Sequence, residues 1–347
     1  MTQRLHGIMN GDDRSVSAGL ARLGLALLEP PYRAVIATRN AMFDRHLRRG
    51  ARLDQPVISV GNLTTGGTGK TPMVIEIARR LLACGRRPAV LLRGYRAGPA
   101  GSDEAVLLET ALGDQVPVRA DPDRRAGAAW VNRVHPDVDV LLLDDGFQHR
   151  QVARDLDLVL IDATCPFGHD HVLPRGMMRE GPRALRRADG IIVTRADQVP
   201  PSDRDVLDRR IQKAAGRAPF AHAVHGWAGW VDESDRQAEV DTGRPVLGVC
   251  GIGNPGAFEA ALRRATEPGT RVMAFRDHHA YAPDDLARIA AEARRIGGPV
   301  VTTDKDWIKW KQLDLPDGLR VYRPVLRIEF LDGADRLDAI LAEVTRR

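Results

Sequence analysis

The sequence is poor in cysteine and has no long apolar run. Its cysteines are Cys84, Cys165 and Cys250. They form no C-x-x-C pair, which argues against a disulfide framework and a thiolate zinc site and fits a reducing compartment best. The most apolar N-terminal stretch, residues 19–28, contains Arg22 and is followed by the pair Pro30 and Pro31. No run of about 18 apolar residues is therefore present to span a bilayer.

Aromatic residues are also scarce, at 5% of the 347 residues, and the excess of basic over acidic residues is small, at 51 − 46 = +5. Nucleic-acid binding typically needs a basic stripe with interleaved aromatic residues, so we expect no nucleic-acid partner. What the sequence does contain is 43% hydrophobic and 28% charged residues, which is typical of a folded globular protein. A chain of this length predicts one large or two medium domains.

Residues 1–52 form a distinct basic segment. From residue 14 to residue 52, eight arginines oppose Glu29 and Asp44, a balance of +6. Apolar residues recur at helical spacing on both sides of the proline pair, which predicts two short amphipathic helices. A membrane-surface helix needs such an apolar stripe flanked by cations, but a helix that packs on its own domain shows the same pattern. From the pattern alone the two interpretations are equally favoured.

From Pro56 onward, short apolar runs alternate with helical patterns, which predicts an α/β fold with a largely parallel sheet. The expected strands are 57–60, 89–92, 138–143, 158–161 and 191–194, followed by 245–250, 272–275 and 300–302. The expected helices of the second set are 257–265 and 284–296. We predict a P-loop NTPase-like domain over 53–220, a linker with extended pieces over 221–243, and a second, smaller α/β domain over 244–347.

A glycine-rich loop, G-N-L-T-T-G-G-T-G-K-T-P at residues 61–72, follows the first expected strand and precedes a helical pattern. In such a loop backbone amides converge on phosphate oxygens, Lys70 reaches the β- and γ-phosphates, and the Thr71 hydroxyl is available to Mg²⁺. The sequence therefore predicts a nucleoside triphosphate site. The expected nucleotide-contacting residues are Thr64, Thr65, Gly66, Gly67, Thr68, Gly69, Lys70 and Thr71. Thr64 stands where the general G-x-x-x-x-G-K-[ST] pattern has glycine.

A second apolar strand, Val138–Leu143, is followed by two adjacent carboxylates, Asp144 and Asp145. A strand-end aspartate usually holds Mg²⁺ in a P-loop enzyme, so Asp144 is the expected magnesium residue, directly or through water. Adjacent residues at a strand end face opposite sides, which predicts a separate role for Asp145. The alternative for such a pair is a turn or helix cap.

Six motifs occur in a fixed order along the chain. They are G-N-L-T-T-G-G-T-G-K-T-P, R-G-Y-R at 93–96, D-D-G-F-Q-H at 144–149, G-I-G-N-P at 251–255, D-H-H at 277–279 and T-T-D-K-D at 302–306. Together, and over nearly the whole chain, they resemble the tetraacyldisaccharide 4′-kinase family of lipid A biosynthesis. The loop with Thr64 is itself a feature of that family, so the departure from the general pattern supports the resemblance.

The resemblance implies a two-domain P-loop kinase that uses ATP and Mg²⁺. It implies transfer of the γ-phosphate to the 4′-hydroxyl of the glycolipid tetraacyldisaccharide 1-phosphate, which gives lipid IVA. It also implies peripheral attachment to the cytoplasmic face of the inner membrane through the N-terminal segment. A family pair that takes the proton from the sugar hydroxyl corresponds here to Asp103 and His278, and with Lys70 and Asp145 these form the expected catalytic set.

Two segments depart from the family pattern or have a second interpretation. Asp103 lies in G-S-D-E-A where the family has G-D-E-P, and residues 168–181 depart from the family's acceptor element. The five arginines of residues 175–187 suit either a clamp for the substrate 1-phosphate or a solvated helix face.

A different functional class is a P-loop GTPase or metallochaperone-like switch. The run V-T-R-A-D at 193–197 supports it, because it loosely resembles the strand-end aspartate that selects guanine. A switch would hydrolyse nucleotide without an acceptor, so strict GTP dependence would favour it over a kinase.

Overall fold

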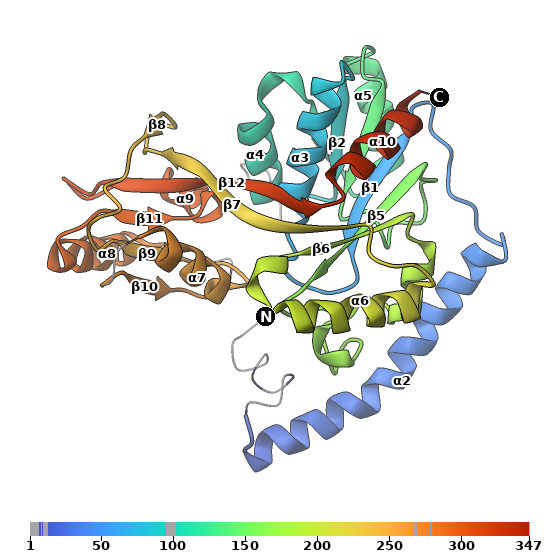
Figure 1. Ribbon diagram of the computed structural model, residues 1–347, viewed down its shortest axis with the longest axis horizontal. Helices are drawn as coiled ribbons and strands as arrows, with labels where there is room; N and C mark the ends of the chain where they lie inside the picture. Colours follow the sequence, from blue (N-terminus) through green and yellow to red (C-terminus); the bar gives the residue numbers. More distant parts are fainter. Residues whose placement is uncertain are drawn as a thin grey trace. The chain divides into compact units, whose positions relative to one another are not determined.

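The computed structural model of the chain describes residues 7, 9, 13–94, 102–266, 269–277 and 279–346. These residues fold into two α/β units (Figure 1). The larger unit contains the described residues of Arg4–His225 and Ile328–Arg347, and the smaller unit contains those of Gly226–Arg327. The chain passes from one unit to the other within two long strands, β7 (Ala221–Val231) and β12 (Val321–Asp332). The expected α/β fold class is confirmed.

The larger unit is built on a parallel sheet with the strand order β7-β6-β5-β1-β4-β2-β3. Before β7, its strands are β1 (Val57–Asn62), β2 (Pro88–Leu92), β3 (Val118–Ala120), β4 (Val140–Asp144), β5 (Leu156–Asp162) and β6 (Gly190–Thr194). Every residue of β1, β2, β4, β5 and β6 is buried, as expected for parallel strands covered on both faces. Each of these five strands overlaps a run that the sequence predicted.

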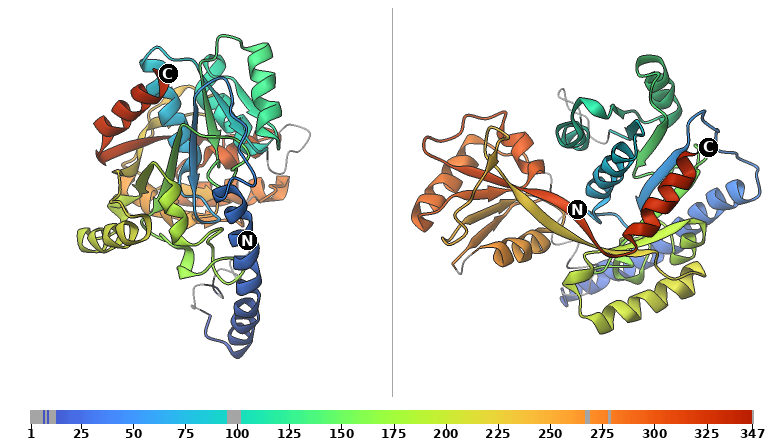
Figure 2. Two further views of the ribbon diagram at one scale, coloured as in Figure 1. Left: turned by 90° about the vertical axis from the view of Figure 1, so that its right-hand side faces the viewer. Right: turned by 45° about the horizontal axis from the view of Figure 1, so that its top comes forward.

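Helices cover both faces of this sheet, as two directions of view show (Figure 2). They are α3 (Lys70–Ala83), α4 (Asp103–Leu112), α5 (Arg124–Val134), α6 (Pro201–Ala215) and α10 (Ala334–Thr345). On one face, α3, α4 and α10 share a core through Ile77, Leu108 and Leu341. On the other face, α5 and α6 pack against the alternate residues of the strands. Segment 328–347 thus packs in the larger unit, although the sequence-based boundary placed it in the smaller domain.

The N-terminal segment does not form the two short helices that we predicted. One 29-residue helix, α2 (Val16–Asp44), continues through Pro30–Pro31. An internal proline costs a helix roughly 3 kcal/mol, so packing on both sides has to compensate. Glu29, just before the prolines, is only 5% exposed, and Tyr32, just after them, donates its hydroxyl to the Arg179 carbonyl at 3.1 Å. Contacts with the larger unit therefore outweigh the local proline signal.

In the smaller unit the strands pair in parallel, in the order β10-β9-β11-β12. Its remaining elements are β9 (Leu247–Cys250), β10 (Arg271–Ala274), β11 (Val300–Thr302), α7 (Pro255–Ala265), α8 (Pro283–Ile296) and α9 (Asp304–Trp310). All but α9 fall where the sequence predicted a strand or helix. The extended pieces of segment 221–243 are β7 and its short antiparallel partner β8 (Gln237–Ala238).

Candidate active site at the phosphate loop

The phosphate loop connects β1 to α3 in the larger unit. β1 ends at Asn62 and α3 begins at Lys70, so the loop lies at the carboxyl edge of the sheet. Gly66 has a φ of 135° and Gly69 a φ of 89°, in a region that favours glycine. Among the residues that the structure describes, no side chain caps the start of α3. The first amides of α3, with the positive end of its dipole, are therefore available to an anion.

Side-chain hydrogen bonds hold the loop in shape. The Asn62 amide group donates to the Thr68 hydroxyl at 2.9 Å, and both residues are buried. The Thr194 hydroxyl donates to the Thr68 carbonyl at 3.0 Å, and the Arg195 guanidinium donates to the Gly67 carbonyl at 2.7 Å. Because these partners come from the protein itself, little of the loop has to be ordered when a phosphate binds.

Residues 177–179 form one side of the loop. The Thr65 amide donates to the Met177 carbonyl, and the Arg179 amide donates to the Leu63 carbonyl, each at 2.7 Å. Thr64 is 6% exposed and pairs with the same segment in an isolated antiparallel bridge. The first residues of the loop thus contact protein, through the part of the chain that departs from the family's acceptor element.

Thr71 and Asp144, the two expected magnesium residues, lie together. The Thr71 hydroxyl donates to Asp144 Oδ2 at 3.1 Å, and both residues are buried. Asp144 Oδ1 is also buried and has no hydrogen-bond partner among the described residues. Burial, with the nearby Glu104 carboxylate, raises the pKa of Asp144 to about 6, although Lys70 opposes the rise. A hydroxyl and an unsatisfied carboxylate oxygen are the donors that Mg²⁺ prefers, so these residues fit the ion.

Asp145 has different partners from its neighbour. Its carboxylate lies 3.6 Å from the Lys70 ammonium group and 2.7 Å from the Arg179 guanidinium. Burial alone would raise the pKa of Asp145, but the two cations outweigh it and hold the pKa below its ordinary value. Asp145 also has a φ of 56°, a strained value for a residue with a side chain. This turn sends two adjacent carboxylates to two separate sets of groups.

Comparison with known proteins relates this chain to a family. The family described as "LpxK: Tetraacyldisaccharide-1-P 4'-kinase" matches residues 21–346. The chain belongs to this family.

Relatives match this chain over most of its length. A tetraacyldisaccharide 4′-kinase of Anaeromyxobacter dehalogenans (strain 2CP-C) is 40% identical over 93% of this chain and 90% of its own. One of Geobacter metallireducens is 36% identical over 89% of this chain and 94% of its own. The crystal structure of LpxK from Aquifex aeolicus in complex with ATP has a TM-score of 0.70 at 25% identity, and the match covers 94% of this chain and 99% of that one.

As a member of the LpxK family, the chain is an ATP-dependent kinase that phosphorylates the 4′-hydroxyl of tetraacyldisaccharide 1-phosphate in lipid A biosynthesis. The resemblance in the sequence is confirmed. The alternative of a GTPase or metallochaperone-like switch is not favoured.

Only part of the expected proton-accepting pair of this chain is described by the structure. Asp103 is the first residue of α4, and the Ser102 hydroxyl before it accepts the Ala105 amide at 3.2 Å. The Asp103 side chain and the whole of His278 lie outside the described residues, so the pair stays a prediction. The next residue, Glu104, is near enough to raise the pKa of Asp144, so the start of α4 lies near the expected magnesium residues.

Sequence reasoning missed several side chains of the site. Arg124, at the start of α5, is 2% exposed and donates to the Asp144 carbonyl at 3.4 Å. His225, near the end of the larger unit's part of β7, has a buried Nε2 with no hydrogen-bond partner among the described residues. A Cβ on Gly69 would lie 2.4 Å from that nitrogen. Burial, with nearby Arg195, lowers the pKa of His225 to about 3, so its imidazole is neutral.

From the sequence, the arginine-rich run 175–187 suits either a phosphate clamp or a solvated helix face. Three of its five arginines are paired with carboxylates. Arg175 lies 3.7 Å from Glu29, Arg179 lies 2.7 Å from Asp145, and Arg187 lies 2.9 Å from Glu180. The composition of the run was the available signal, but it did not reveal that Arg179 reaches the phosphate loop.

Proposed function

We propose a specific division of roles within the kinase reaction. The loop amides and the start of α3 bind the β- and γ-phosphates of ATP, and Lys70 neutralises the charge that develops during transfer. Asp145 remains ionised and, with Arg179, keeps the Lys70 ammonium group oriented. The distances from Asp145 to these two cations, 3.6 and 2.7 Å, support this assignment.

In the proposal Thr71 and Asp144 hold Mg²⁺, directly or through water. The bound ion supplies charge neutralisation on the triphosphate. The supporting observation is Asp144 Oδ1, because a buried carboxylate oxygen without a partner is costly unless a ligand completes it. Because the pKa of Asp144 is raised to about 6, protonation of this carboxylate below that pH competes with the cation.

Asp103 and His278 take the proton of the 4′-hydroxyl in this proposal. A carboxylate beside an imidazole selects its tautomer and lets it accept a proton near neutral pH, a contribution of about 10²–10⁴ in rate. The resemblance to the family supports the assignment, as does the position of Asp103 beside Glu104 at the start of α4.

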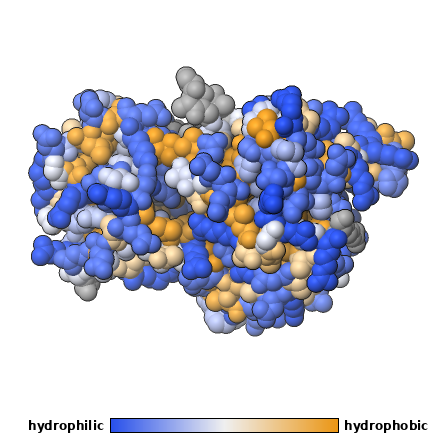
Figure 3. All heavy atoms as spheres, turned by 90° about the horizontal axis from the view of Figure 1, so that it is seen from above, coloured by the Kyte–Doolittle hydropathy of each residue, from blue (hydrophilic) through white to orange (hydrophobic). Residues whose placement is uncertain are grey.

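We further propose that α2 lies on the cytoplasmic surface of the inner membrane. Val16, Leu20, Leu23 and Leu27 recur at i, i+4, i+7 and i+11, which places them on one helix face, and they are 61–82% exposed. Exposed apolar residues on the helix of the arginine-rich segment 14–52 suit the boundary between headgroups and acyl chains. By contrast, hydrophilic residues cover most of the molecular face in Figure 3, with apolar residues in scattered groups. None of the described helices has the length and apolar character to cross a membrane.

Transfer of radiolabelled γ-phosphate from ATP to tetraacyldisaccharide 1-phosphate in neutral detergent tests the proposed reaction. We expect labelled glycolipid only with Mg²⁺, and little nucleotide hydrolysis without the acceptor. Strict GTP dependence, or hydrolysis that ignores the acceptor, would contradict it. In the same assay Asp103→Ala should lower kcat with nucleotide binding retained, and an unchanged kcat would remove Asp103 from the catalytic group.

A further inference from the structure

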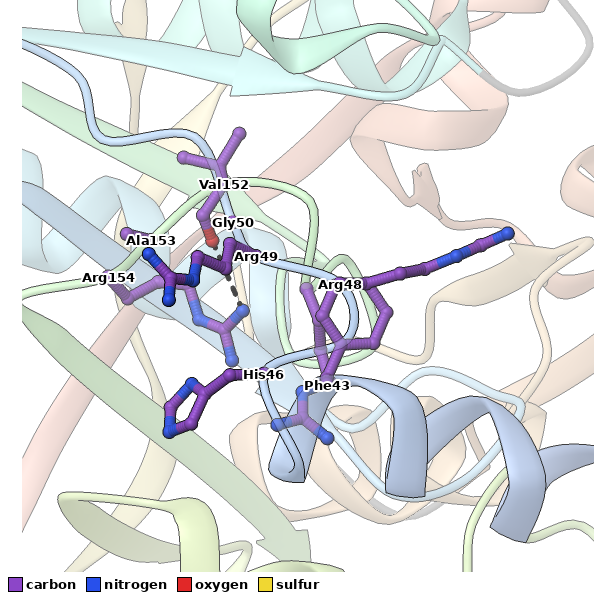
Figure 4. Close-up of a pocket in the computed structure, with 9 residues that line it drawn as sticks. Phe43, His46, Arg48, Arg49, Gly50, Val152, Ala153 and Arg154 are labelled. Carbon is purple, nitrogen blue, oxygen red and sulfur yellow. Dashed lines mark hydrogen bonds between the residues drawn. The ribbon is translucent and has the colours of Figure 1, made fainter.

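A basic cavity lies at the C-terminal end of α2, outside the residues of the proposed active site (Figure 4). Its volume is about 300 Å³. The side chains that line it are mainly those of Phe43, His46, Arg48, Arg49, Arg150 and Arg154. An adjoining hollow shares Phe43, Arg48 and Arg49 with it and adds Arg125. Among the described residues that line either space, none is acidic.

Two backbone segments fix the walls of this cavity. The Ala51 amide donates to the Gln151 carbonyl at 2.7 Å, and the Ala153 amide donates to the Ala51 carbonyl at 2.9 Å. Gly50 approaches the second segment so closely that a Cβ would lie 2.9 Å from the Ala153 nitrogen. The space between the turn after α2 and the segment 150–153 is therefore a built feature rather than a gap between loose side chains.

The two inner arginines of the cavity are already neutralised. Arg150 lies 2.7 Å from Asp44, and Arg154 lies 2.7 Å from Asp157. Arg150 also covers the ring of Phe43, with 5.0 Å between its guanidinium carbon and the ring centre. These pairs make the floor of the cavity stable without a bound anion.

The two outer arginines, Arg48 and Arg49, are exposed. Within the part of the chain that the structure describes, neither has a carboxylate at salt-bridge distance. In Figure 4 the Arg48 side chain extends to one side while Arg49 lies near Gly50. Planar guanidinium groups bind phosphate through paired N–H donors, so these residues are the unused cations of the cavity.

The segment that carries these cations also exposes apolar side chains. Leu47, the residue before Arg48, is 74% exposed, and α2 carries the exposed stripe that begins at Val16. A free anion would match the charge of the cavity but would leave this apolar surface in water. An anion that is attached to hydrocarbon matches both features.

We propose that the cavity binds the phosphate of an anionic phospholipid headgroup, with Arg48 and Arg49 as its ligands. The inference rests on the proposed attachment of α2 to the membrane and adds to it a defined headgroup site. The 1-phosphate of the acceptor has the same chemistry, and the test below separates the two sources.

Vesicle sedimentation of the full chain tests whether binding depends on the charges of Arg48 and Arg49. Vesicles of phosphatidylcholine alone are compared with vesicles that also contain phosphatidylglycerol. The double variant Arg48→Gln, Arg49→Gln should lose about 30-fold in affinity for the anionic vesicles, or about fivefold per basic residue, and should keep its affinity for the neutral ones. The matched control, Arg209→Gln with Lys213→Gln on the exposed side of α6, should bind both like the wild type. Equal anionic binding by the double variant and the wild type would overturn the proposal.

A second variant distinguishes binding inside the cavity from attraction by general surface charge. Ala153→Leu fills the cavity without changing any charge, and Ala153→Ser is its control of nearly the same size. We expect Ala153→Leu to lose the preference for phosphatidylglycerol at an unchanged melting temperature, and Ala153→Ser to keep it. If Ala153→Leu keeps the preference while the arginine variant loses it, diffuse charge explains the binding and the headgroup site is wrong.

Kinase kinetics in neutral detergent identify the source of the phosphate. We expect the double arginine variant to keep the wild-type kcat and KM for tetraacyldisaccharide 1-phosphate. A raised KM with unchanged vesicle binding would assign the cavity to the acceptor and overturn the headgroup proposal. Failure of the wild type to transfer phosphate would contradict the proposed reaction instead, whatever the vesicles show.

Discussion

The phosphate loop and the basic cavity both lie in the larger unit, and they are built in opposite ways. At the loop, buried partners such as Asn62 and Thr194 fix the backbone, and the unsatisfied atoms include a buried carboxylate oxygen of Asp144. At the cavity, the inner arginines Arg150 and Arg154 are paired with carboxylates. The unused groups, Arg48 and Arg49, are exposed. A pre-ordered buried site selects the geometry of its ligand, whereas exposed flexible cations mainly attract charge.

The difference in burial also predicts different responses to salt. Interactions between exposed charges are screened within about 8–10 Å at moderate ionic strength, and buried ones much less. Binding at Arg48 and Arg49 should therefore weaken as salt rises, while the Asp145 interactions with Lys70 and Arg179 should persist. Variants of the phosphate loop and variants of the N-terminal segment both test this comparison. The largest effect is expected at the loop.

Lys70→Ala should reduce kcat by about 10³-fold, because it removes a positioned cation from the transferred phosphate. The fold should survive, since Asp145 keeps its 2.7 Å contact with Arg179. Turnover with ATP and the melting temperature are the two measurements. Lys70→Arg, which keeps the charge but changes its shape, serves as the control. Its kcat should lie between those of the wild type and Lys70→Ala. A Lys70→Ala enzyme with wild-type kcat would remove Lys70 from the mechanism.

The double variant Leu20→Ser, Leu27→Ser should lower affinity for vesicles by about 100-fold, since each leucine contributes roughly 1.5 kcal/mol when it leaves water. Both side chains are more than half exposed, so melting temperature and activity in detergent should not change. Deleting the helix would be a poorer test, because the buried contacts of Glu29 and Tyr32 would be lost with it.

Two exposed apolar residues of the larger unit outside α2 provide the matched control. Val206 on α6 is 48% exposed and Leu331 at the end of β12 is 52% exposed. Val206→Ser with Leu331→Ser should sediment with vesicles like the wild type. Similar losses in both double variants would mean that the exposed stripe of α2 has no special role.

Asp144→Asn should stabilise the ligand-free protein by about 3 kcal/mol at neutral pH while turnover is nearly lost. Burial raises the pKa of Asp144 from 3.8 to about 6, a rise of about two units, and each unit corresponds to about 1.4 kcal/mol. The folded state therefore binds the proton more tightly than the unfolded state, and the wild type loses stability as pH rises from about 4 to about 6. Asparagine has no charge to bury, so the gain should be absent near pH 4 and complete above pH 6.

Denaturant unfolding across this pH range measures the effect, and Asp157→Asn is its control. Asp157 is equally buried, its pKa is also raised by burial and one of its carboxylate oxygens also has no hydrogen-bond partner among the described residues, but it pairs with Arg154 at 2.7 Å. Its replacement leaves a buried guanidinium without its partner and should destabilise the protein. Stabilisation by both variants, or by neither, would show that burial of the Asp144 carboxylate without a salt bridge carries no special cost.

The sequence was most informative where one local pattern determined one local structure. The buried strand, the glycine loop and the helix of residues 57–83 were predictable, because the apolar run, the glycines and Lys70 are consecutive. The same holds for the strand that ends at Asp144. Local rules failed at Pro30–Pro31, where packing of the residues on both sides kept α2 intact.

Contacts between distant segments left no comparable signal. Arg179 reaches Asp145 across 34 residues, and Arg195 reaches Gly67 across 128. In a chain with 51 lysines and arginines, composition does not reveal which of them line a phosphate site. The basic cavity is a similar case, because Arg48 and Arg154 become neighbours only when the two backbone segments pair.

Arg179→Lys is expected to have the smallest of these effects, about a tenfold loss in kcat/KM. Arg179 Nη1 donates to Asp145 at 2.7 Å and to the Gln148 side chain at 3.3 Å, and a lysine ammonium group, a compact charge on a flexible stem, does not reproduce the position of this planar donor. Arg179→Gln should be worse and should also raise the pKa of Asp145, because one of the two cations that lower it is lost.

Steady-state kinetics from pH 5 to 8, a range of about three units around neutrality, distinguish this positioning role from a purely structural one. In Arg179→Gln the acid limb of the pH profile should move to higher pH, whereas Arg179→Lys should leave it near the wild type because the charge is kept. Arg183→Lys, on an exposed residue of the same run, is the control and should be neutral. If all three profiles coincide with the wild type, Asp145 and Lys70 are oriented without Arg179, and the segment 177–179 contributes to the site only through its backbone.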